Sequence, residues 1–168
     1  MKKMKRLVAV LLAGIMALAV LTACGGTPSA PVTRDEALEK SVAEWTVELG
    51  KGANLELTQD ATLTSISDKC LSAMVKIYDA KDEDAAKAAE KELKKAFVAA
   101  TKGKKVAPVA VYIPGTKVTK DALAQAVQND MSNIQADLER FGVNKPTKFG
   151  VTATKQKDYT LILFMVSE

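Results

Sequence analysis

Hydrophobic side chains recur every three to four residues through four segments of this chain, the spacing of amphipathic helices. The first segment carries its apolar face at Leu38, Val42, Trp45 and Leu49. Thr33 and Glu36 have the spacing of a capping box, so we expect a helix with Thr33 as its N-cap. Gly50 and Gly52 mark its end, because glycine commonly follows the last helical turn.

The other three helices have similar start and stop signals. Asp60 and Asp82 are expected to cap the second and third helices, and the third ends near Gly103. The apolar face of the second helix comprises Leu63, Ile66, Cys70, Met74 and Ile77. A fourth helix is predicted over about 119–141, followed by Gly142. Its predicted inward residues are Leu123, Val127, Met131, Ile134, Leu138 and Phe141.

β-branched and aromatic residues replace this pattern in three segments, which we interpret as strands. The segment 106–113 precedes a Pro-Gly turn, and Pro108 confines it to an edge of the sheet or to a strand's first residues. The segments 147–154 and 158–166 form a hairpin, and the second is apolar enough to be buried on both faces. The sequence therefore predicts an α+β domain, with about four helices packed on a small antiparallel sheet and a C-terminal hairpin.

The first 24 residues have the layout of an export signal. Met1–Arg6 is basic, and the next 17 residues, Leu7–Ala23, carry no charge. Leu21-Thr22-Ala23-Cys24 resembles the lipobox of bacterial lipoproteins. That resemblance implies cleavage between Ala23 and Cys24, and lipidation of the Cys24 thiol with acyl chains such as palmitate. An uncleaved transmembrane anchor is the alternative.

Both interpretations place the remaining chain outside the cytoplasmic membrane. With a lipid on Cys24, the protein would be anchored on the extracytoplasmic face of the cell membrane. We expect a signal peptide at 1–23, a flexible Gly- and Pro-rich tether at 24–32 and a single globular domain at 33–168.

Charge and composition exclude several classes of function. The chain has 24 basic and 20 acidic residues, but four basic residues precede Cys24, so the mature part is neutral. A neutral domain lacks the positive field that attracts nucleic acids, and we expect no nucleic-acid partner. Histidine is absent, which excludes triads, zinc sites and haem ligation that depend on it. Cys70 has no cysteine partner once Cys24 is lipidated, and we expect it in the core.

Three stretches match patterns of one known family. Residues 57–63 fit "L-x-x-D-x-x-L", residues 126–133 are similar to "A-V-x-x-W-M-x-S", and residues 148–153 with 158–161 look like "I-G-V-G-V-A … Y-Y-W-V". In this order they resemble the CAP superfamily of cysteine-rich secretory, antigen 5 and pathogenesis-related proteins, which includes bacterial SCP-like domains. The resemblance covers about half of the mature chain and implies an α-β-α sandwich.

The chain departs from this family at the metal cavity, which the family builds from two His and two Glu. The corresponding positions fall on Cys70 for the first His, Val111 for a Glu and about Ala136 for the second His. The second Glu has no counterpart that can be placed. The resemblance therefore implies a degenerate CAP-like domain without the metal tetrad.

Other charged groups have ordinary structural explanations. Asp79, Asp82, Glu83 and Asp84 lack the spacing of a calcium loop and suit a helix N-terminus. Lys102, Lys104 and Lys105 suit either a helix C-terminus or contact with anionic lipid or wall polymer.

We therefore expect a non-catalytic module without cofactor or metal, binding a protein, peptide, lipid or cell-wall ligand. The alternative is a cell-envelope hydrolase that uses carboxylates alone, which needs two carboxylates about 5–10 Å apart in a pocket.

Overall fold

A four-stranded mixed sheet lies at the centre of the computed structural model, which describes residues 32–168. Its strand order is β1-β3-β4-β2. β3 (Lys148–Lys155) and β4 (Tyr159–Ser167) form the predicted hairpin, and β2 (Ala107–Pro114) runs antiparallel to β4. β1 (Thr58–Gln59) is only two residues long and pairs in parallel with the start of β3. Ala23 and Cys24, the predicted cleavage and lipidation residues, lie outside the described residues.

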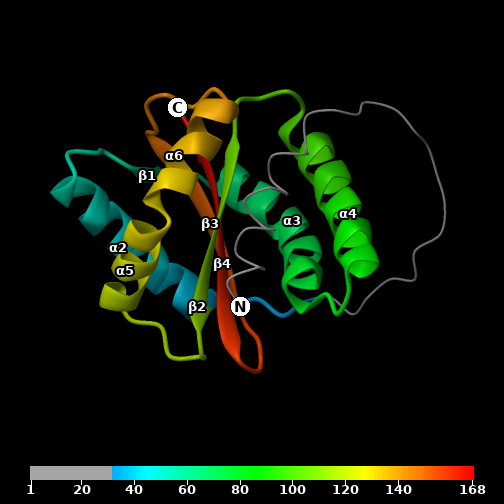
Figure 1. Cartoon of the computed structure of the whole chain (residues 1–168). Helices are drawn as coiled ribbons and strands as arrows, with labels where there is room; N and C mark the ends of the chain where they lie inside the picture. Colours follow the sequence, from blue (N-terminus) through cyan, green and yellow to red (C-terminus); the bar gives the residue numbers. More distant parts are fainter. Residues whose placement is uncertain (1–31) are drawn as a thin grey trace. The chain divides into compact units, whose positions relative to one another are not determined.

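Helices cover both faces of this sheet and complete an α+β fold (Figure 1). α3 (Ala61–Asp79) and α4 (Glu83–Thr101) pack on one face, whereas α2 (Glu36–Gly52), α5 (Lys120–Asn129) and α6 (Met131–Arg140) are grouped on the other side. The predicted α+β class is therefore confirmed, whereas the expected purely antiparallel sheet is wrong, because β1 pairs in parallel with β3. No helix between residues 32 and 168 is long and apolar enough to cross a membrane.

The core consists of two hydrophobic clusters separated by the sheet. β4 contributes to both, because successive side chains of a strand point to opposite faces. Leu161, Leu163 and Met165 face α3 and α4, while Ile162 and Phe164 belong to the cluster with α2 and α5. Burial of β4 on both faces, as the apolar run 159–166 predicts, is confirmed.

The structure divides the predicted fourth helix in two, so residues 32–168 contain five helices where four were expected. Asp130 ends α5 and precedes α6, and its side chain accepts a hydrogen bond from Asn133 Nδ2 at 2.5 Å. Asn and Asp compete with the helix for backbone hydrogen bonds, which favours a break at the sequence Asn129-Asp130. The turn leaves Met131 49% exposed, so its predicted inward position is wrong.

The start of α2 also differs from the expectation. Asp35, not Thr33, is the N-cap, and its carboxylate accepts the N–H of Leu38 at 2.9 Å. The capping box at Thr33 is therefore wrong, because that residue is held against the sheet instead: its carbonyl accepts a hydrogen bond from Thr154 Oγ1. The predicted caps Asp60 and Asp82 are both confirmed.

Gly150 lets α3 lie directly on β3. A Cβ atom at this position would lie 2.0 Å from the backbone nitrogen of Thr64 and 2.1 Å from the carbonyl carbon of Leu63. Since both contacts are with helix backbone, no side-chain movement could relieve them. The absence of a side chain at Gly150 thus sets the spacing between the first turn of α3 and the sheet.

β2 forms one outer edge of the sheet, in agreement with the expectation from Pro108. The Gly115 N–H donates to the Asp158 carbonyl at 2.8 Å, and antiparallel pairs alternate along a strand. The backbone groups of odd-numbered β2 residues therefore hydrogen-bond to β4, whereas those of even-numbered residues point away from the sheet. Pro108 and Pro114 occupy two of these outward positions and have no N–H to offer a further strand. The edge is thereby protected against pairing with another chain.

Candidate functional site

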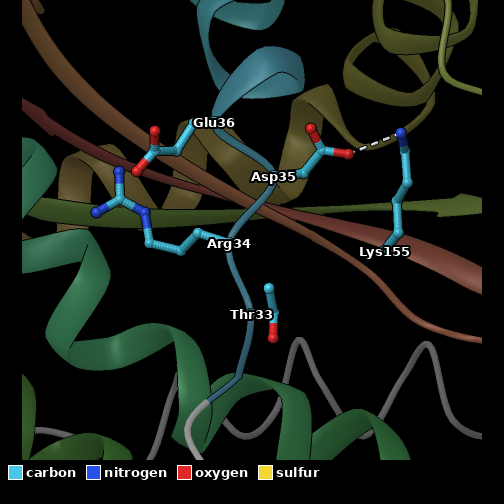
Figure 2. Close-up of a pocket in the computed structure, with 5 residues that line it drawn as sticks. All are labelled: Thr33, Arg34, Asp35, Glu36 and Lys155. Carbon is cyan, nitrogen blue, oxygen red and sulfur yellow. Dashed lines mark ion pairs between the residues drawn. The ribbon is translucent and has the colours of Figure 1, made fainter.

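An open pocket of about 440 Å³ lies where the chain enters α2 (Figure 2). Its lining residues are Thr33, Arg34, Asp35, Glu36 and Lys155. The volume falls within the range of about 300–1,000 Å³ that is typical of ligand pockets. Four of the five lining residues are charged, however, whereas such pockets are usually lined by apolar and aromatic groups.

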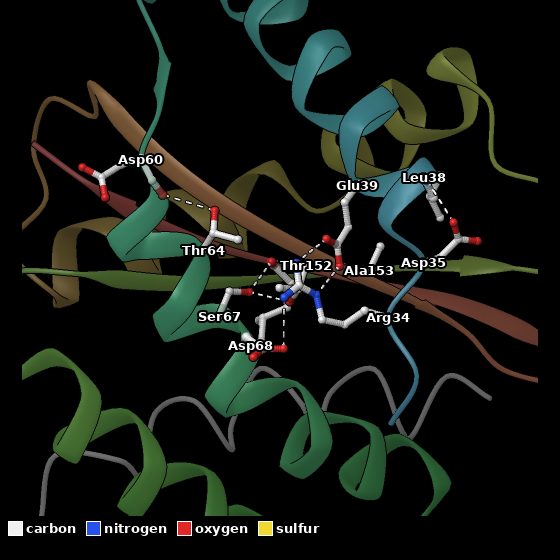
Figure 3. A network of polar contacts seen from close by, with 11 residues as sticks. Arg34, Asp35, Leu38, Glu39, Asp60, Thr64, Ser67, Asp68, Thr152 and Ala153 are labelled. Carbon is white, nitrogen blue, oxygen red and sulfur yellow. Dashed lines mark hydrogen bonds and ion pairs between the residues drawn. The ribbon is translucent and has the colours of Figure 1, made fainter. Parts of the chain in front are cut away.

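Arg34 and Glu39 form the central ion pair beside this pocket (Figure 3). Arg34 Nε donates to Glu39 Oε1 at 2.9 Å and Nη2 donates to Oε2 at 2.5 Å, the two-pronged geometry that suits a guanidinium and a carboxylate. Hydrogen bonding to Glu39, the largest influence, raises the pKa of Arg34 above its usual value. Asp68 of α3 lies 3.4 Å from Nη1 and links the pair to a second helix.

The Glu39 carboxylate also completes the sheet. Its Oε1 accepts a hydrogen bond from the backbone N–H of Ala153 in β3 at 2.9 Å. The carbonyl of Ala153 in turn accepts the N–H of Asp35 at 2.8 Å. Ala153 lies beyond the two residues that β1 covers, so these bonds replace those of a missing strand. Glu39 is only 6% exposed, and its three hydrogen bonds satisfy a carboxylate that would otherwise be costly to bury.

Asp35 and Lys155 form the second ion pair of the pocket, at 2.7 Å. The hydrogen bond from Lys155, followed by that from the Leu38 N–H, lowers the pKa of Asp35. This carboxylate therefore caps α2 and holds the end of β3 at the same time. Glu36 is exposed and contributes to raising the pKa of Arg34 by electrostatic attraction.

A buried pair of hydroxyl groups lies deeper, between α3 and the sheet. Ser67 Oγ lies 2.7 Å from Thr152 Oγ1 and donates to the carbonyl of Leu163 at 2.7 Å. Both hydroxyl residues are fully buried. These hydrogen bonds of Ser67 fix α3 to the sheet, because they join the helix to both β3 and β4.

The polar groups around the pocket therefore serve mainly to hold α2, α3 and the entering chain on the edge of β3. The carboxylates of Asp35 and Glu39 each accept a hydrogen bond from a backbone N–H and pair with a cation. Sequence reasoning missed this network. The available signal was Glu39 itself, an acid next to Leu38 in the inner stripe of α2.

The three positions that the CAP resemblance assigns to metal ligands lie in different parts of the structure. Cys70 belongs to the core cluster on the α3 and α4 face, whereas Val111 belongs to the cluster on the other face, and Ala136 is exposed on α6. Cys70 is fully buried, as expected, and burial raises the pKa of its thiol to about 12. A thiol with that pKa is unreactive at neutral pH.

Three of the four acidic residues at the α3–α4 connection have separate structural partners. Asp82 caps α4, Glu83 pairs with Lys87, and Asp79 accepts the hydroxyl of Tyr159 at 2.7 Å. Within residues 32–168, no three Cys, Asp or Glu side chains come close enough together to hold a metal ion.

Asp137 on α6 is the carboxyl whose ionisation the fold disfavours most clearly. Partial burial raises its pKa to about 6, with a further increase from Asp130 and an opposing effect from Arg140. Perturbed acids of this kind occur at catalytic sites, although structural positions also produce them. Asp130 immediately precedes α6, and its charge contributes to the raised pKa of Asp137.

Comparisons with protein-family models, with curated proteins and with solved structures find no match to this chain. The CAP-like resemblance accordingly stays a prediction from the sequence.

Replacement of Glu39 by alanine should destabilise the domain by about 2–3 kcal/mol, because it leaves the Ala153 N–H and the Arg34 guanidinium without their main partner. Glu44→Ala is the matched control, since Glu44 is an exposed acid of the same helix, and it should change stability by less than about 0.5 kcal/mol. Urea unfolding of both variants measures this. Equal effects would contradict the role assigned to Glu39.

Asp137 should make the domain less stable as pH rises. Its folded-state pKa of about 6 exceeds its ordinary value of 3.8, so between these values the folded state binds more protons than the unfolded state. Asp137→Asn should remove this loss, which we expect to be about 1 kcal/mol after allowance for partial solvent exposure. Thermal unfolding at pH 4–8 tests this, with exposed Asp158→Asn as control. A variant that retains the wild-type pH profile would disprove it.

Proposed function

We propose that this protein is a membrane-anchored, extracytoplasmic lipoprotein whose CAP-like domain binds a partner and catalyses no reaction. In this proposal Cys24 carries the lipid, residues 24–32 are the tether, and the domain lacks the family's His/Glu metal tetrad and needs no cofactor. The partner is a protein, peptide, lipid or cell-wall component. Nucleic acid is not among the expected partners, because the mature chain is neutral.

The engagement of Asp35, which lines the pocket, and of Glu39, which lies beside it, carries the non-catalytic part of this proposal. A catalytic carboxylate must reach its substrate and exchange protons with it. Asp35 is instead fixed by Lys155 and the start of α2, and Glu39 by Arg34 and the Ala153 N–H. Removing either from these partners would release the chain from the sheet edge, so catalysis by them would conflict with folding.

The arrangement of the domain's first residues supports the anchoring part. Thr33 and Asp35 are hydrogen-bonded to Thr154 and Ala153, so a tether that precedes them would pull on the edge of a sheet rather than on a frayed end. Force on a lipid-anchored chain would then be spread over several backbone hydrogen bonds.

A carboxylate-only hydrolase is the second candidate, and Asp137 is the observation that favours it. A carboxyl with a pKa near 6 is suited to act as a general acid. Asp130, whose charge contributes to the raised pKa of Asp137, would have to supply the second carboxylate. Release of soluble sugar or peptide fragments from purified cell walls, lost in Asp137→Asn but not in Asp158→Asn, would favour this candidate over the non-catalytic one.

Cys24→Ser should move the protein out of the lipid-modified membrane fraction, because serine lacks the thiol that would be acylated. Metabolic labelling with a fatty acid, followed by membrane fractionation, measures both effects. Cys70→Ala is the matched control: it removes the chain's other thiol, which is buried, and should leave labelling unchanged. Normal processing and full membrane retention of Cys24→Ser would indicate an uncleaved helical anchor instead.

A further inference from the structure

Five exposed lysines gather at one end of the domain, in the segments that enter β2 and β3. We call this surface the distal lysine cluster; its members are Lys102, Lys104, Lys105, Lys145 and Lys148. The first three follow α4, whereas the other two follow α6. In Figure 1 this is the upper end, where α4 and α6 finish and the C-terminus lies.

The residues around the end of β4 bring the two groups together. The side chain of Lys105 lies beside Gly142. A Cβ atom added to Gly142 would be 3.6 Å from the Cε atom of Lys105. Glu168 accepts the backbone N–H of Asn144 at 2.9 Å and is attracted by Lys105. Lys148 pairs with Ser167 at the start of β3. Lysines far apart in the sequence therefore share one surface, and Glu168 is the acid in their midst.

Two carboxylates near the cluster oppose its charge: Glu168, which Lys105 attracts, and Asp60, which Lys148 attracts. None of the five lysines forms an ion pair with another residue of the part 32–168. The opposite end of the sheet is different, since two of its cations, Arg34 and Lys155, are paired. Asp35, Asp82 and Asp158 also lie in the loops and entering segment there. The distal end thus carries more lysines than acids, whereas cations and acids are mixed at the other end of the domain.

The cluster lies at the opposite end of the domain from Val32, where the described part of the chain begins. Thr33 is bonded to Thr154, near the last residue of β3, whereas Lys148 is the first residue of that strand. An eight-residue strand spans about 23 Å from its first to its last residue. A domain tethered at residue 32 can therefore turn these lysines away from the membrane that holds it.

We propose that the distal lysine cluster binds a polyanionic chain of the cell envelope, one that carries repeated phosphate or carboxylate groups. This inference rests on the extracytoplasmic location in the proposed function. Five flexible ammonium groups from two separate segments of the chain suit repeated anionic groups along a polymer, because each acts as a point charge without a fixed geometry. The distance from the tether favours such a polymer over the lipid headgroups of the anchoring membrane.

The test measures binding of linear inorganic polyphosphate to the full-length protein in neutral detergent, as a function of salt. Lys104→Gln/Lys105→Gln/Lys145→Gln should weaken binding at least about tenfold and reduce the slope of log Kd against log salt by about 2, because each phosphate contact on a flexible chain contributes about 0.7. The control Lys81→Gln/Lys117→Gln/Lys157→Gln removes the same charge from exposed lysines at the other end and should bind like wild type. Equal weakening by both variants, or no binding by wild type, would overturn the proposal.

A second readout separates the polymer from the membrane. In protein reconstituted into phosphatidylglycerol vesicles, Lys104, Lys105 and Lys145 should stay reactive to an amine-acetylating reagent until polyphosphate is added. Protection by the vesicles alone would assign the cluster to lipid headgroups and reject the polymer. The outcome is independent of the anchor test: normal acylation of Cys24 without polyphosphate binding would reject this inference alone, and binding without acylation would reject the anchor.

Discussion

The outer edge of β3 is the constraint on which the rest of the structure depends. β3 has eight residues, but β1 covers only two of them, so the remaining edge needs other hydrogen-bond partners. The Glu39 carboxylate accepts the backbone N–H of Ala153, and the Asp35 N–H donates to the Ala153 carbonyl. Arg34 compensates the charge of Glu39. A carboxylate thus replaces a strand, and the start of the domain, α2 and the sheet are joined by one set of polar contacts.

This use of charged groups separates structure from recognition within the molecule. Asp35 and Glu39 stabilise the fold, and their carboxylates are already paired with Lys155 and Arg34. The opposite edge of the sheet, along β2, carries two outward prolines and is a poor site for adding a strand. The five lysines of the distal lysine cluster form no ion pair within residues 32–168, and we therefore propose recognition for them and not for the pocket.

The helices, the hairpin and the burial of β4 could be predicted because each depends on local spacing: apolar residues at helical or continuous intervals, and Asp60 and Asp82 at helix starts. The break at Asp130 was not apparent, since the apolar period continues through it. Asp35 replaced Thr33 as a cap because β3, more than a hundred residues away, binds the entering chain. The Arg34–Glu39–Ala153 network could not be predicted for the same reason. Its hydrogen bonds depend on the position of β3, which the local sequence around Arg34 and Glu39 does not indicate.

Hydrogen exchange of the Ala153 amide tests the central claim most directly, because this amide donates to Glu39 and to no neighbouring strand. If Glu39 closes the sheet edge, the Ala153 N–H should exchange only on global unfolding, with the same free energy of opening as the Ile162 amide in the central strand. The exposed turn residue Lys157 provides the fast reference. Exchange of Ala153 at a rate close to that of Lys157 would contradict the claim.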